Sequence, residues 1–484
     1  MNVLLINPTG GPVEEYGALA KATPELPQLG LASLATVLKV NGHKVKIIDM
    51  HVEAMSVNDI LSEISSGGYE VVGFSVYVTT VKNTIILAGR IKNKFPHITI
   101  CVGGPQATLD PDFFAKPSID YVFRGEADLT FADFIDKLDN KKTIDNICGC
   151  LKNENGILKG NRNLSLVEDI DALPLLEVEE FYDLDKFHQP VQVRGKKAIN
   201  VVSVRGCPFL CTFCAAGTIT GRKLRKISVT RFVDYLEKMV KKGFDSFMIY
   251  DDTFTVDKKR AVAISEEIIR RNLKIVWNCW SRADCVDPET LAVMKKAGCY
   301  LIMYGFESFN EKTLLRLKKG FTAKDCLESV KTTKNAGMVA SASFMIGLPG
   351  EDEKDIINTI DIAVKSGLDI GIFGIFEPYE GTPIYTDCKA SGKWIKSKYK
   401  NRLLLDQDEV WVPDGLTREK IEKFARLAFG RFYLRASYLA SLFNMLKHLS
   451  WERRIKFIQA GLDYFIFQRL STVANKFVKG SRFR

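Results

Sequence analysis

Three closely spaced cysteines are the residues of this sequence best suited to chemistry. Cys207, Cys211 and Cys214 follow an apolar, β-branched run at residues 199–204, with the spacing C-x3-C-x2-C. Three thiolates on one short loop can each bind one iron of a four-iron, four-sulfur (4Fe-4S) cluster, which leaves the fourth iron without a protein ligand. The loop therefore predicts a metal site that is open to a small molecule.

Zinc, a disulfide and inert thiols are the other interpretations of these cysteines. Structural zinc takes four Cys or His ligands, but the next cysteine is Cys279 and no histidine follows the loop before His448. The 11 cysteines show no regular pairing, and the apolar start of the chain lacks the basic region and cleavage site of a secretion signal. We therefore expect reduced thiols in a cytoplasmic protein, and the spacing favours the iron–sulfur cluster.

The loop resembles the cluster loop of radical S-adenosylmethionine (SAM) enzymes, including a phenylalanine, Phe213, just before the last cysteine. In that family, the amine and carboxylate of SAM bind the unique iron. The reduced cluster then cleaves SAM to a 5′-deoxyadenosyl radical. The resemblance implies that Cys207, Cys211 and Cys214 are the metal ligands and that Phe213 belongs to the cofactor site.

Residues 1–140 predict a doubly wound, flavodoxin-like α/β domain. Short apolar strands alternating with amphipathic helices are typical of a parallel sheet covered on both faces. Ligands of such sheets bind at the carboxyl ends of the strands, where the sequence has Ser75, Gly103 and Gly104. Glycines there let a bulky ligand approach the backbone closely. The expected strands are 3–7, 44–49, 71–76, 98–104 and 121–125, and the expected helices are 29–41, 57–65, 82–95 and 127–138.

The same segment resembles the cobalamin-binding domain often found ahead of a radical SAM core. The resemblance rests on residues 27–30, 42–43, 103–105 and 124–126, while no G-x-G-x-x-G follows the first strand, which disfavours a dinucleotide. His51 follows the second strand rather than the first, so we do not expect it to bind cobalt. The cofactor would then bind without a protein imidazole. A flavodoxin-like domain that binds nothing is the alternative, because a fold alone does not give a function.

Residues 141–195 are interpreted as a linker between two domains, with a hairpin around residues 153–156. Cys148 and Cys150 in this segment are too isolated to form a second cluster.

Residues 196–390 predict a partial (βα)6 barrel that is open on one side. After the strand that leads into the cysteine loop, strands are expected at 245–252, 274–282, 299–307, 340–348 and 370–378, with helices at 230–242, 257–271, 288–297, 323–336 and 353–366. Barrel chemistry lies at the carboxyl ends of the strands. The polar and glycine residues at these ends are Asp251, Asp252, Ser281, Arg282, Glu307 and Gly347.

The resemblance to radical SAM enzymes implies roles for these strand ends. Glu307 would accept hydrogen bonds from the ribose or amine of SAM, and Ser281 with Arg282 would reach its ribose or carboxylate. The turn at Gly347 would pack on adenine. Asp251 and Asp252 stand where the family usually has Gly-Gly-Glu, the amine-binding motif. Because a Tyr or Phe followed by Asp-Asp is familiar in the cobalamin-linked subgroup, the resemblance implies that both aspartates bind SAM. One of the two acids could instead cap the helix that begins near residue 256.

Residues 391–484 predict a helical, basic C-terminal region. The net charge of the chain is +10, and residues 418–484 hold 15 Lys or Arg against four Asp or Glu. Helices are expected at 418–435, 437–449 and 451–478. Their apolar stripe either packs on the barrel or rests on anionic lipid. The chain has no apolar run of 18 residues, so no membrane-spanning helix is expected, and nucleic-acid binding is not expected either.

These resemblances together imply a cobalamin-dependent radical SAM enzyme, most simply a methyltransferase that moves a methyl group from methylcobalamin to an unactivated carbon. They imply a small-molecule or lipid substrate and an external electron donor of the flavodoxin or ferredoxin type. One alternative is a cobalamin-assisted oxidation, cyclisation or ring contraction of a lipid or tetrapyrrole-like substrate without methyl transfer. The other is a non-catalytic module that binds cobalamin or an iron–sulfur cluster. A cytoplasmic location is expected, with peripheral membrane contact through the basic C-terminal region as its variant.

Overall fold

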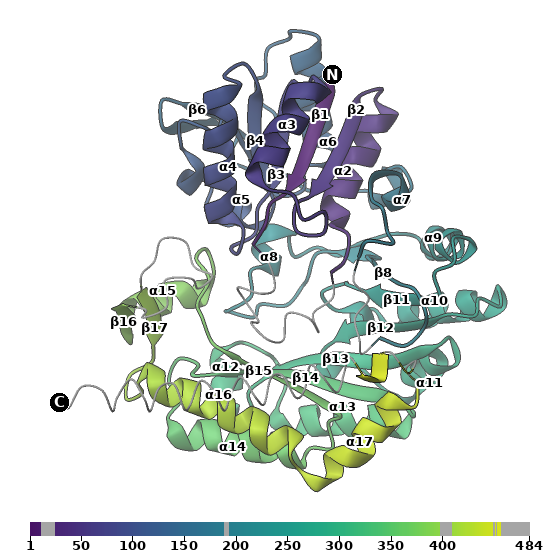
Figure 1. The fold of residues 1–484 in the computed structure, drawn as a ribbon. Helices are drawn as coiled ribbons and strands as arrows, with labels where there is room; N and C mark the ends of the chain where they lie inside the picture. Colours follow the sequence, from purple (N-terminus) through teal and green to yellow (C-terminus); the bar gives the residue numbers. More distant parts are fainter. Residues whose placement is uncertain (11–24, 188–192, 397–408, 449–450, 452, 456–484) are drawn as a thin grey trace.

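The structure is a computed structural model of the 484-residue chain, and it describes residues 1–10, 25–187, 193–396, 409–448, 451 and 453–455. Two mainly parallel sheets dominate the fold. In Figure 1 the N-terminal sheet stands above the barrel sheet, and the C-terminal helices run along the lower side of the barrel. The region between the two sheets is therefore enclosed by both halves of the chain.

The N-terminal sheet has the strand order β2-β1-β3-β4-β5-β6-β7, and its first five strands are parallel. This order is flavodoxin-like, with a switch point between β1 and β3. The predicted doubly wound fold is confirmed, and the short helix α5 was not expected. The elements are β1 (Asn2–Asn7), α2 (Leu29–Val40), β2 (Lys44–Asp49), α3 (Val57–Gly67), β3 (Val71–Ser75), α4 (Val81–Lys94), β4 (Thr99–Gly103), α5 (Pro105–Leu109), β5 (Tyr121–Phe123) and α6 (Asp128–Asp139).

The predicted hairpin around residues 153–156 is present, but it belongs to this sheet. It consists of β6 (Cys150–Glu154) and β7 (Ile157–Gly160), and β6 pairs antiparallel with β5. An open edge at β5 would leave backbone groups without partners, and the hairpin supplies them. The sheet thus continues to Gly160, beyond the domain boundary expected near residue 140.

The rest of the connecting segment is part of the core. It holds the short helix α7 (Val178–Phe181), and Leu173 and Tyr182 lie in one buried apolar cluster with Phe134 of the N-terminal domain and Phe232 of the barrel. Apolar side chains in a connection gain free energy by leaving water, about 25 cal/mol per Å² buried. The segment expected to be a linker therefore helps to join the two halves.

The barrel sheet has six parallel strands in the order β15-β14-β13-β12-β11-β8, so β8 and β15 are its two edges. The predicted partial barrel is confirmed. Its elements are β8 (Ala198–Val201), α9 (Val229–Lys241), β11 (Ser246–Ile249), α10 (Lys258–Arg270), β12 (Val276–Ser281), α11 (Pro288–Lys296), β13 (Cys299–Glu307), α12 (Glu311–Arg316), α13 (Ala323–Asn335), β14 (Val339–Ile346), α14 (Glu353–Lys365) and β15 (Ile370–Ile375). Between β8 and α9 lie β9 (Val204–Arg205), α8 (Ala216–Ile219) and β10 (Arg225–Lys226).

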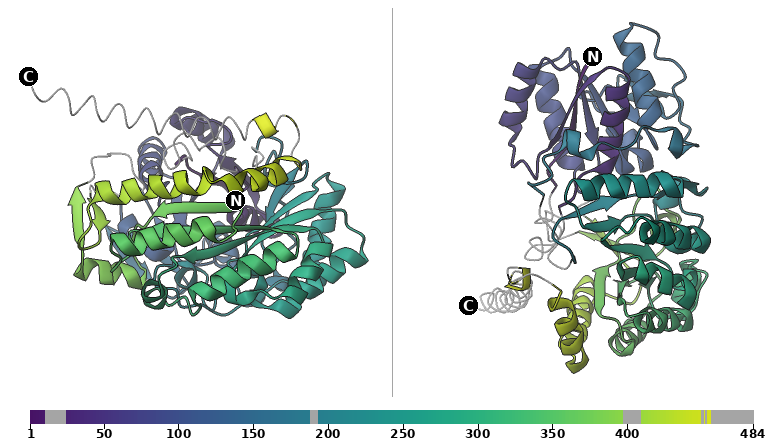
Figure 2. Two further views of the ribbon diagram at one scale, coloured as in Figure 1. Left: turned by 90° about the horizontal axis from the view of Figure 1, so that it is seen from below. Right: turned by 90° about the vertical axis from the view of Figure 1, so that its right-hand side faces the viewer.

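The C-terminal region begins with α15 (Pro383–Ala390), and β16 (Lys393–Lys396) pairs with β17 (Glu409–Val412). Helix α16 (Arg418–Tyr433) follows and buries Ile421, Phe424 and Phe432 against the barrel, which favours the packing interpretation of its apolar stripe. Helix α17 (Ala436–Leu446) continues along the barrel (Figure 2). The helix expected at 451–478 lies almost wholly outside the described residues.

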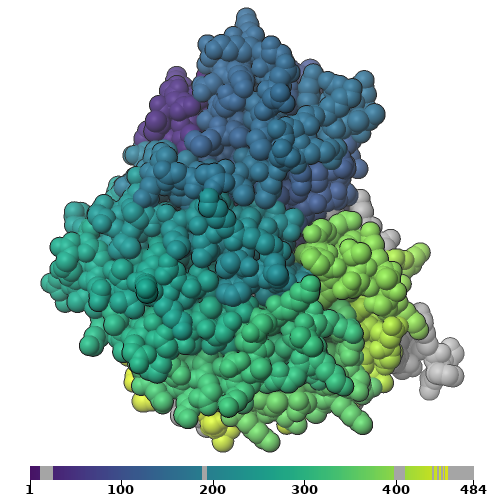
Figure 3. All heavy atoms as spheres, turned by 180° about the vertical axis from the view of Figure 1, so that it is seen from behind, coloured from purple at the N-terminus to yellow at the C-terminus, as the bar shows by residue number. Residues whose placement is uncertain are grey.

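The two halves are in direct contact. Seen from behind, the blue N-terminal half rests on the teal and green barrel along a continuous seam (Figure 3). Among the described residues, no helix is both long enough and apolar enough to span a bilayer.

Candidate active site

The backbone of the cysteine loop is fixed at both of its ends. Gly206 has φ +93°, and a Cβ at this position would lie 2.3 Å from the carbonyl oxygen of Lys223, so only glycine fits without a shift. The next amide, that of Cys207, donates to the carbonyl of Gly221 at 3.1 Å. At the far end, the amide of Thr212 donates to the carbonyl of Leu317 at 3.0 Å. The loop is therefore held on one side by the segment between α8 and β10 and on the other by the segment after α12.

The three thiols of this loop are neighbours. All three are free and partly buried. Burial raises the pKa of the Cys214 thiol to about 11, and the charges of Asp252, Cys211 and Cys207 add to that rise. Arg282 Nη1 lies 3.7 Å from Cys211 Sγ and brings a positive charge to the thiols.

Within the described part of the chain, no three Cys, His, Asp or Glu side chains are arranged to hold a single metal ion. A 4Fe-4S cluster takes one thiolate per iron, so its ligands surround a cube and do not converge on one point. Three adjacent thiols on a pinned loop, beside a guanidinium group, fit such a cluster.

Glu307 ends β13 in a strained and buried position. Its φ is +71°, and the register between β13 and β14 shifts at this residue. Non-glycine residues with such backbone angles cluster at functional sites. Burial raises the pKa of Glu307, although the charge of Lys319 opposes that shift. The carboxylate accepts hydrogen bonds from Lys319 Nζ at 3.4 Å and from Ser343 Oγ at 3.4 Å.

Lys319 is the site residue that the sequence analysis missed. Its side chain is 5% exposed, and its ammonium group lies 5.4 Å from the ring centroid of Phe213 and 5.1 Å from that of Phe321. Phe213 therefore lies beside the Lys319–Glu307 ion pair of the barrel. No motif marks Lys319, because it stands in a loop next to a second lysine, Lys318, which is exposed.

Arg282 and Ser281 lie next to each other in the chain but point to different surroundings. The guanidinium of Arg282 is 3.5 Å from the ring centroid of Phe209 in the cysteine loop, and it pairs with Asp284. The Ser281 hydroxyl is buried and bonded to Thr255 Oγ1 at 2.5 Å. Arg282 thus borders the cysteines, whereas Ser281 supports the barrel wall.

The two adjacent aspartates, Asp251 and Asp252, also have different surroundings. Asp251 is 1% exposed, and its carboxylate accepts hydrogen bonds from the amides of Ser203 and Val204 at 2.6 and 3.0 Å. Burial raises its pKa to about 6. Both oxygens of Asp251 have partners in the strand that leads to the cysteines, because Ser203 Oγ also donates to it. The helix after these aspartates is capped by Asp257 instead.

Asp252 is directed into open space. Its side chain lines the cavity described below, and the surrounding protein still raises its pKa. No described residue donates a hydrogen bond to its carboxylate. Of the two acids, Asp252 is the one available to a ligand.

Gly347 faces the C-terminal region. It has φ +85°, and a Cβ there would lie 3.1 Å from Ile421 Cδ1 of α16. The turn needs glycine both for its backbone angle and for this close helix contact.

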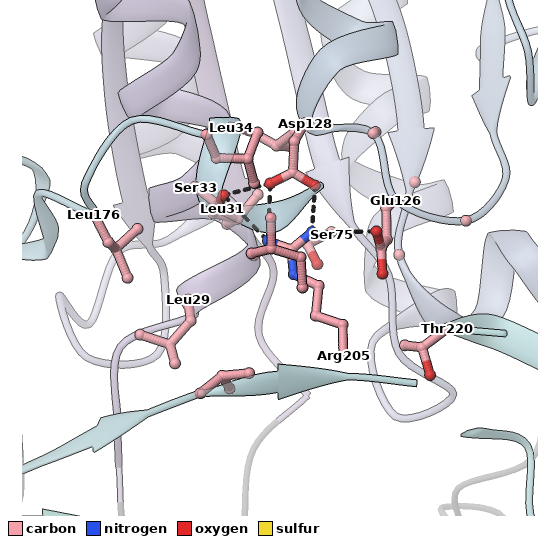
Figure 4. Close-up of a pocket in the computed structure, with 18 of the residues that line it drawn as sticks. Leu29, Leu31, Ser33, Leu34, Ser75, Glu126, Asp128, Leu176, Arg205 and Thr220 are labelled. Carbon is pink, nitrogen blue, oxygen red and sulfur yellow. Dashed lines mark hydrogen bonds and ion pairs between the residues drawn. The ribbon is translucent and has the colours of Figure 1, made fainter. Parts of the chain in front are cut away.

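A cavity of about 460 Å³ lies between the two halves (Figure 4). Its upper wall comes from the carboxyl ends of β3 and β4 and from the start of α2, and its lower wall comes from the cysteine-loop region and the end of β11. Most of the wall is apolar. The lining includes Leu29, Gly30, Ser75, Gly103, Gly104, Phe123, Val202, Arg205, Tyr250 and Asp252.

The glycines of this wall suit close contact with a ligand. Gly104 has φ +92°, and a Cβ there would lie 2.9 Å from the backbone nitrogen of Val76. No histidine is among the lining residues. His51 instead pairs with Glu25, with 2.8 Å between Nε2 and Oε1. The lining of the cavity is mostly apolar, and it places no imidazole in the cavity.

Comparisons with known proteins agree with this arrangement. Residues 201–363 match the model of the radical SAM superfamily, and residues 17–135 match the B12-binding domain. An uncharacterized methyltransferase of Pyrococcus horikoshii, PH0819, is 32% identical over 416 residues, which cover 85% of this chain and 89% of that protein. An anaerobic magnesium-protoporphyrin IX monomethyl ester cyclase of Synechocystis is 24% identical over 369 residues, covering 74% and 72% of the two chains.

A solved structure has the same fold. It is the radical SAM methyltransferase TsrM of Kitasatospora setae with cobalamin and a [4Fe-4S] cluster bound, with a TM-score of 0.72, 14% identity and coverage of 88% of this chain and 90% of that one. The cofactors of the present chain are SAM, a 4Fe-4S cluster and cobalamin. The chain belongs to the cobalamin-binding radical SAM enzyme family.

Proposed function

We propose that this enzyme methylates an unactivated carbon of a small-molecule substrate. The observation that carries the proposal is the lining of the interdomain cavity, which includes Asp252 and the residues Val204, Arg205 and Gly206 directly before Cys207. The cobalamin cavity and the cluster loop therefore open onto a common space. A substrate in that space can face both cofactors, as radical formation and methyl transfer require.

When bound, the cluster with SAM supplies a 5′-deoxyadenosyl radical that removes a hydrogen atom from carbon, and methylcobalamin supplies the methyl group. The three loop cysteines hold the cluster as thiolates. Lys319 and Arg282 provide positive charge for the carboxylate of SAM, and Glu307 and Asp252 provide acceptors for its amine or ribose. Ser75, Gly103 and Gly104 admit cobalamin close to the backbone. Phe213 shields the charged groups beside it from water.

Two of the residues expected at strand ends take supporting roles in this proposal. We assign Asp251 and Ser281 to supporting the barrel wall, because their polar atoms are already hydrogen-bonded within it. Gly347 serves the contact with α16, so its contribution to adenine binding is indirect.

Anaerobic reconstitution with iron, sulfide and cobalamin tests the proposal. Absorption spectra should show both cluster and corrinoid, and a reductant with SAM should yield 5′-deoxyadenosine. Changing the three loop cysteines to alanine should abolish that product, whereas Cys148→Ala, outside the site, should not. Formation of 5′-deoxyadenosine without the cluster would refute the assignment.

Cyclisation or oxidation without methyl transfer is the second candidate function, and the similarity to the Synechocystis cyclase favours it. The mass of the product separates the two. Methyl transfer adds CH2 to the substrate, whereas cyclisation or oxidation leaves the number of carbon atoms unchanged.

We further propose two contacts. An external flavodoxin- or ferredoxin-type protein delivers the electron, which reconstitution with either protein and no chemical reductant would test. The C-terminal region touches anionic lipid at the membrane surface, because Leu434, Phe443 and Trp451 are exposed while the stripe of α16 is already packed. Co-sedimentation with anionic vesicles should fall when residues 437–484 are deleted.

A further inference from the structure

A buried ionic network joins the N-terminal domain to the base of the cysteine loop. Glu126 and Asp128 come from the N-terminal domain just after β5, whereas Arg205 and Arg225 are register partners in the β9–β10 pair. Arg205 Nη1 lies 2.8 Å from Asp128 Oδ2 and 3.4 Å from Glu126 Oε2. Arg225 Nη2 lies 2.7 Å from Glu126 Oε1. Figure 4 shows Asp128 and Arg205 facing each other at the cavity wall.

The network is balanced in charge and largely buried, with Arg205 its most exposed member at 21%. The side chains of Arg225, Asp128 and Glu126 are 1%, 6% and 8% exposed. Paired residues on adjacent antiparallel strands point to the same face, so the two arginines would repel each other without the two acids. Burial alone would raise the pKa of Asp128, but the charge and hydrogen bonds of Arg205 outweigh it and lower the pKa. Each member is therefore costly to keep buried without the others.

A third segment enters the same network. The amide of Val167, in the connecting segment, donates to Glu126 Oε2 at 2.8 Å, and the Val167 carbonyl accepts from Arg225 Nη1 at 2.8 Å. The amide of Glu126 donates to the carbonyl of Ser165 at 2.8 Å. Three stretches that are far apart in sequence thus meet at one pair of carboxylates.

The network lies directly beside the metal-binding loop. Arg205 precedes Cys207 by two residues, and the amide of Cys207 is itself held by the carbonyl of Gly221 at 3.1 Å. Glu126, Asp128 and Arg205 also line the cavity. A shift of the N-terminal domain would therefore pull on the first cysteine.

We propose that the Glu126–Asp128–Arg205–Arg225 network is a docking clamp that fixes the cysteine loop at a set position relative to the interdomain cavity. Asp128 and Arg205 are then positioning residues. The purpose of the clamp rests on the proposed function, because methyl transfer needs cluster and corrinoid at a constant separation. Its existence does not, and the test begins with the cofactor-free chain.

Hydrogen exchange followed by mass spectrometry measures how strongly the clamp protects nearby backbone amides in the cofactor-free chain. Asp128→Asn removes one charge with little change of shape and leaves the Arg205 guanidinium unbalanced. We expect the amides of Cys207, Glu126 and Val167 to exchange at least about tenfold faster, because removing one partner of a buried pair destabilises the contact strongly. Amides of β13 should keep the wild-type rate. Unchanged exchange at Cys207, or equal acceleration throughout the barrel, would overturn the proposal.

Two further variants separate docking from general stability. The matched control is Asp369→Asn, because Asp369 is also buried and ion-paired, with Lys334 Nζ, but within the barrel. It should accelerate exchange around β15 and leave Cys207 unchanged. The double variant Asp128→Asn with Arg205→Gln restores charge balance and should recover part of the protection at Cys207. A double variant that is no better than the sum of the single ones would contradict a charge-based clamp.

The enzyme with its cluster and cobalamin bound allows a measurement that would not change if Asp128 only stabilised the fold. Asp128→Asn should retain iron and cobalamin near wild-type content, but the magnetic coupling between reduced cluster and cob(II)alamin should become weaker or more heterogeneous in electron paramagnetic resonance. Coupling identical to wild type would refute the positioning role. Failure of the wild type to bind cobalamin would instead refute the proposed function, and the exchange result would still stand.

Discussion

The ammonium group of Lys319 lies 3.4 Å from Glu307 Oε1, and both side chains are buried beside the loop that carries the three cysteines. A buried ion pair is weak evidence for stability, since desolvation offsets much of its attraction. SAM brings one carboxylate and one amine. Lys319 can therefore pair with the carboxylate of SAM and Glu307 with its amine, and these two contacts would replace the ion pair between the two residues.

Lys319→Met should weaken SAM binding roughly 10- to 100-fold, which corresponds to the loss of one hydrogen bond to a charged group. Equilibrium binding of SAM to the reconstituted protein measures it. Lys318→Met is the matched control, because Lys318 is adjacent and exposed, and it should bind SAM as the wild type does. Equal SAM affinity in both variants would exclude Lys319 from the site.

Gly206→Ala should prevent assembly of the cluster, because a Cβ at residue 206 would collide with the carbonyl of Lys223. Iron and sulfide content after reconstitution measures the effect. Gly243→Ala is the control, since Gly243 has φ +90° and open space around the Cβ position. It should lose only roughly 1–2 kcal/mol of stability from backbone strain and keep its iron. Full iron content in Gly206→Ala would show that the loop can be shifted without loss.

Asp251→Asn and Asp252→Asn should have opposite consequences. Asp251 accepts hydrogen bonds from two amides and a hydroxyl, so its variant should lose about 1–3 kcal/mol of unfolding free energy. Asp252 has no hydrogen-bond donor among the described residues, so its variant should keep the stability but form less 5′-deoxyadenosine. Denaturant unfolding and product analysis, run on both variants, check the contrast. The reverse pattern would exchange the two roles.

Stability should fall between about pH 4.5 and pH 7 because of Glu351. Burial raises the pKa of this carboxyl to about 7 in the folded chain. The folded state therefore binds the proton more tightly than the unfolded state, and this contribution to stability is lost as pH rises through that window, by roughly 3 kcal/mol in total. Denaturant unfolding at several pH values measures it. Glu351→Gln should show a shallower decline than the wild type over the same window, and an identical slope would contradict the assignment.

Most of the architecture followed from the sequence. The strands and helices of both halves lie close to the expected ranges, because each strand is a short β-branched run and each helix has an apolar face, and both patterns are local. Cys207, Cys211 and Cys214 were found in the same way. Their spacing within eight residues is itself the signal.

The hairpin after residue 140 and the buried side chains of the predicted linker could not be foreseen, for a non-local reason. Whether a hairpin is free or completes the edge of a sheet depends on β5, which precedes it by many residues. Likewise, Leu173 and Tyr182 are apolar in any linker, and only their neighbours in space make them part of a core.

Local sequence determined which residue types stand at each strand end, but it did not determine which way they point. Asp251 and Asp252 are identical in type and adjacent in the chain, and only the packing of β8 against β11 turns one inward and leaves the other facing the cavity. For the same reason, the sequence did not reveal the role of Lys319. It also did not reveal that Glu126 pairs with Arg225 and Asp128 with Arg205. The role of a charged side chain depends on the partners that folding brings within about 4 Å of it. In these pairs the partners lie 12 to 99 residues away in the sequence.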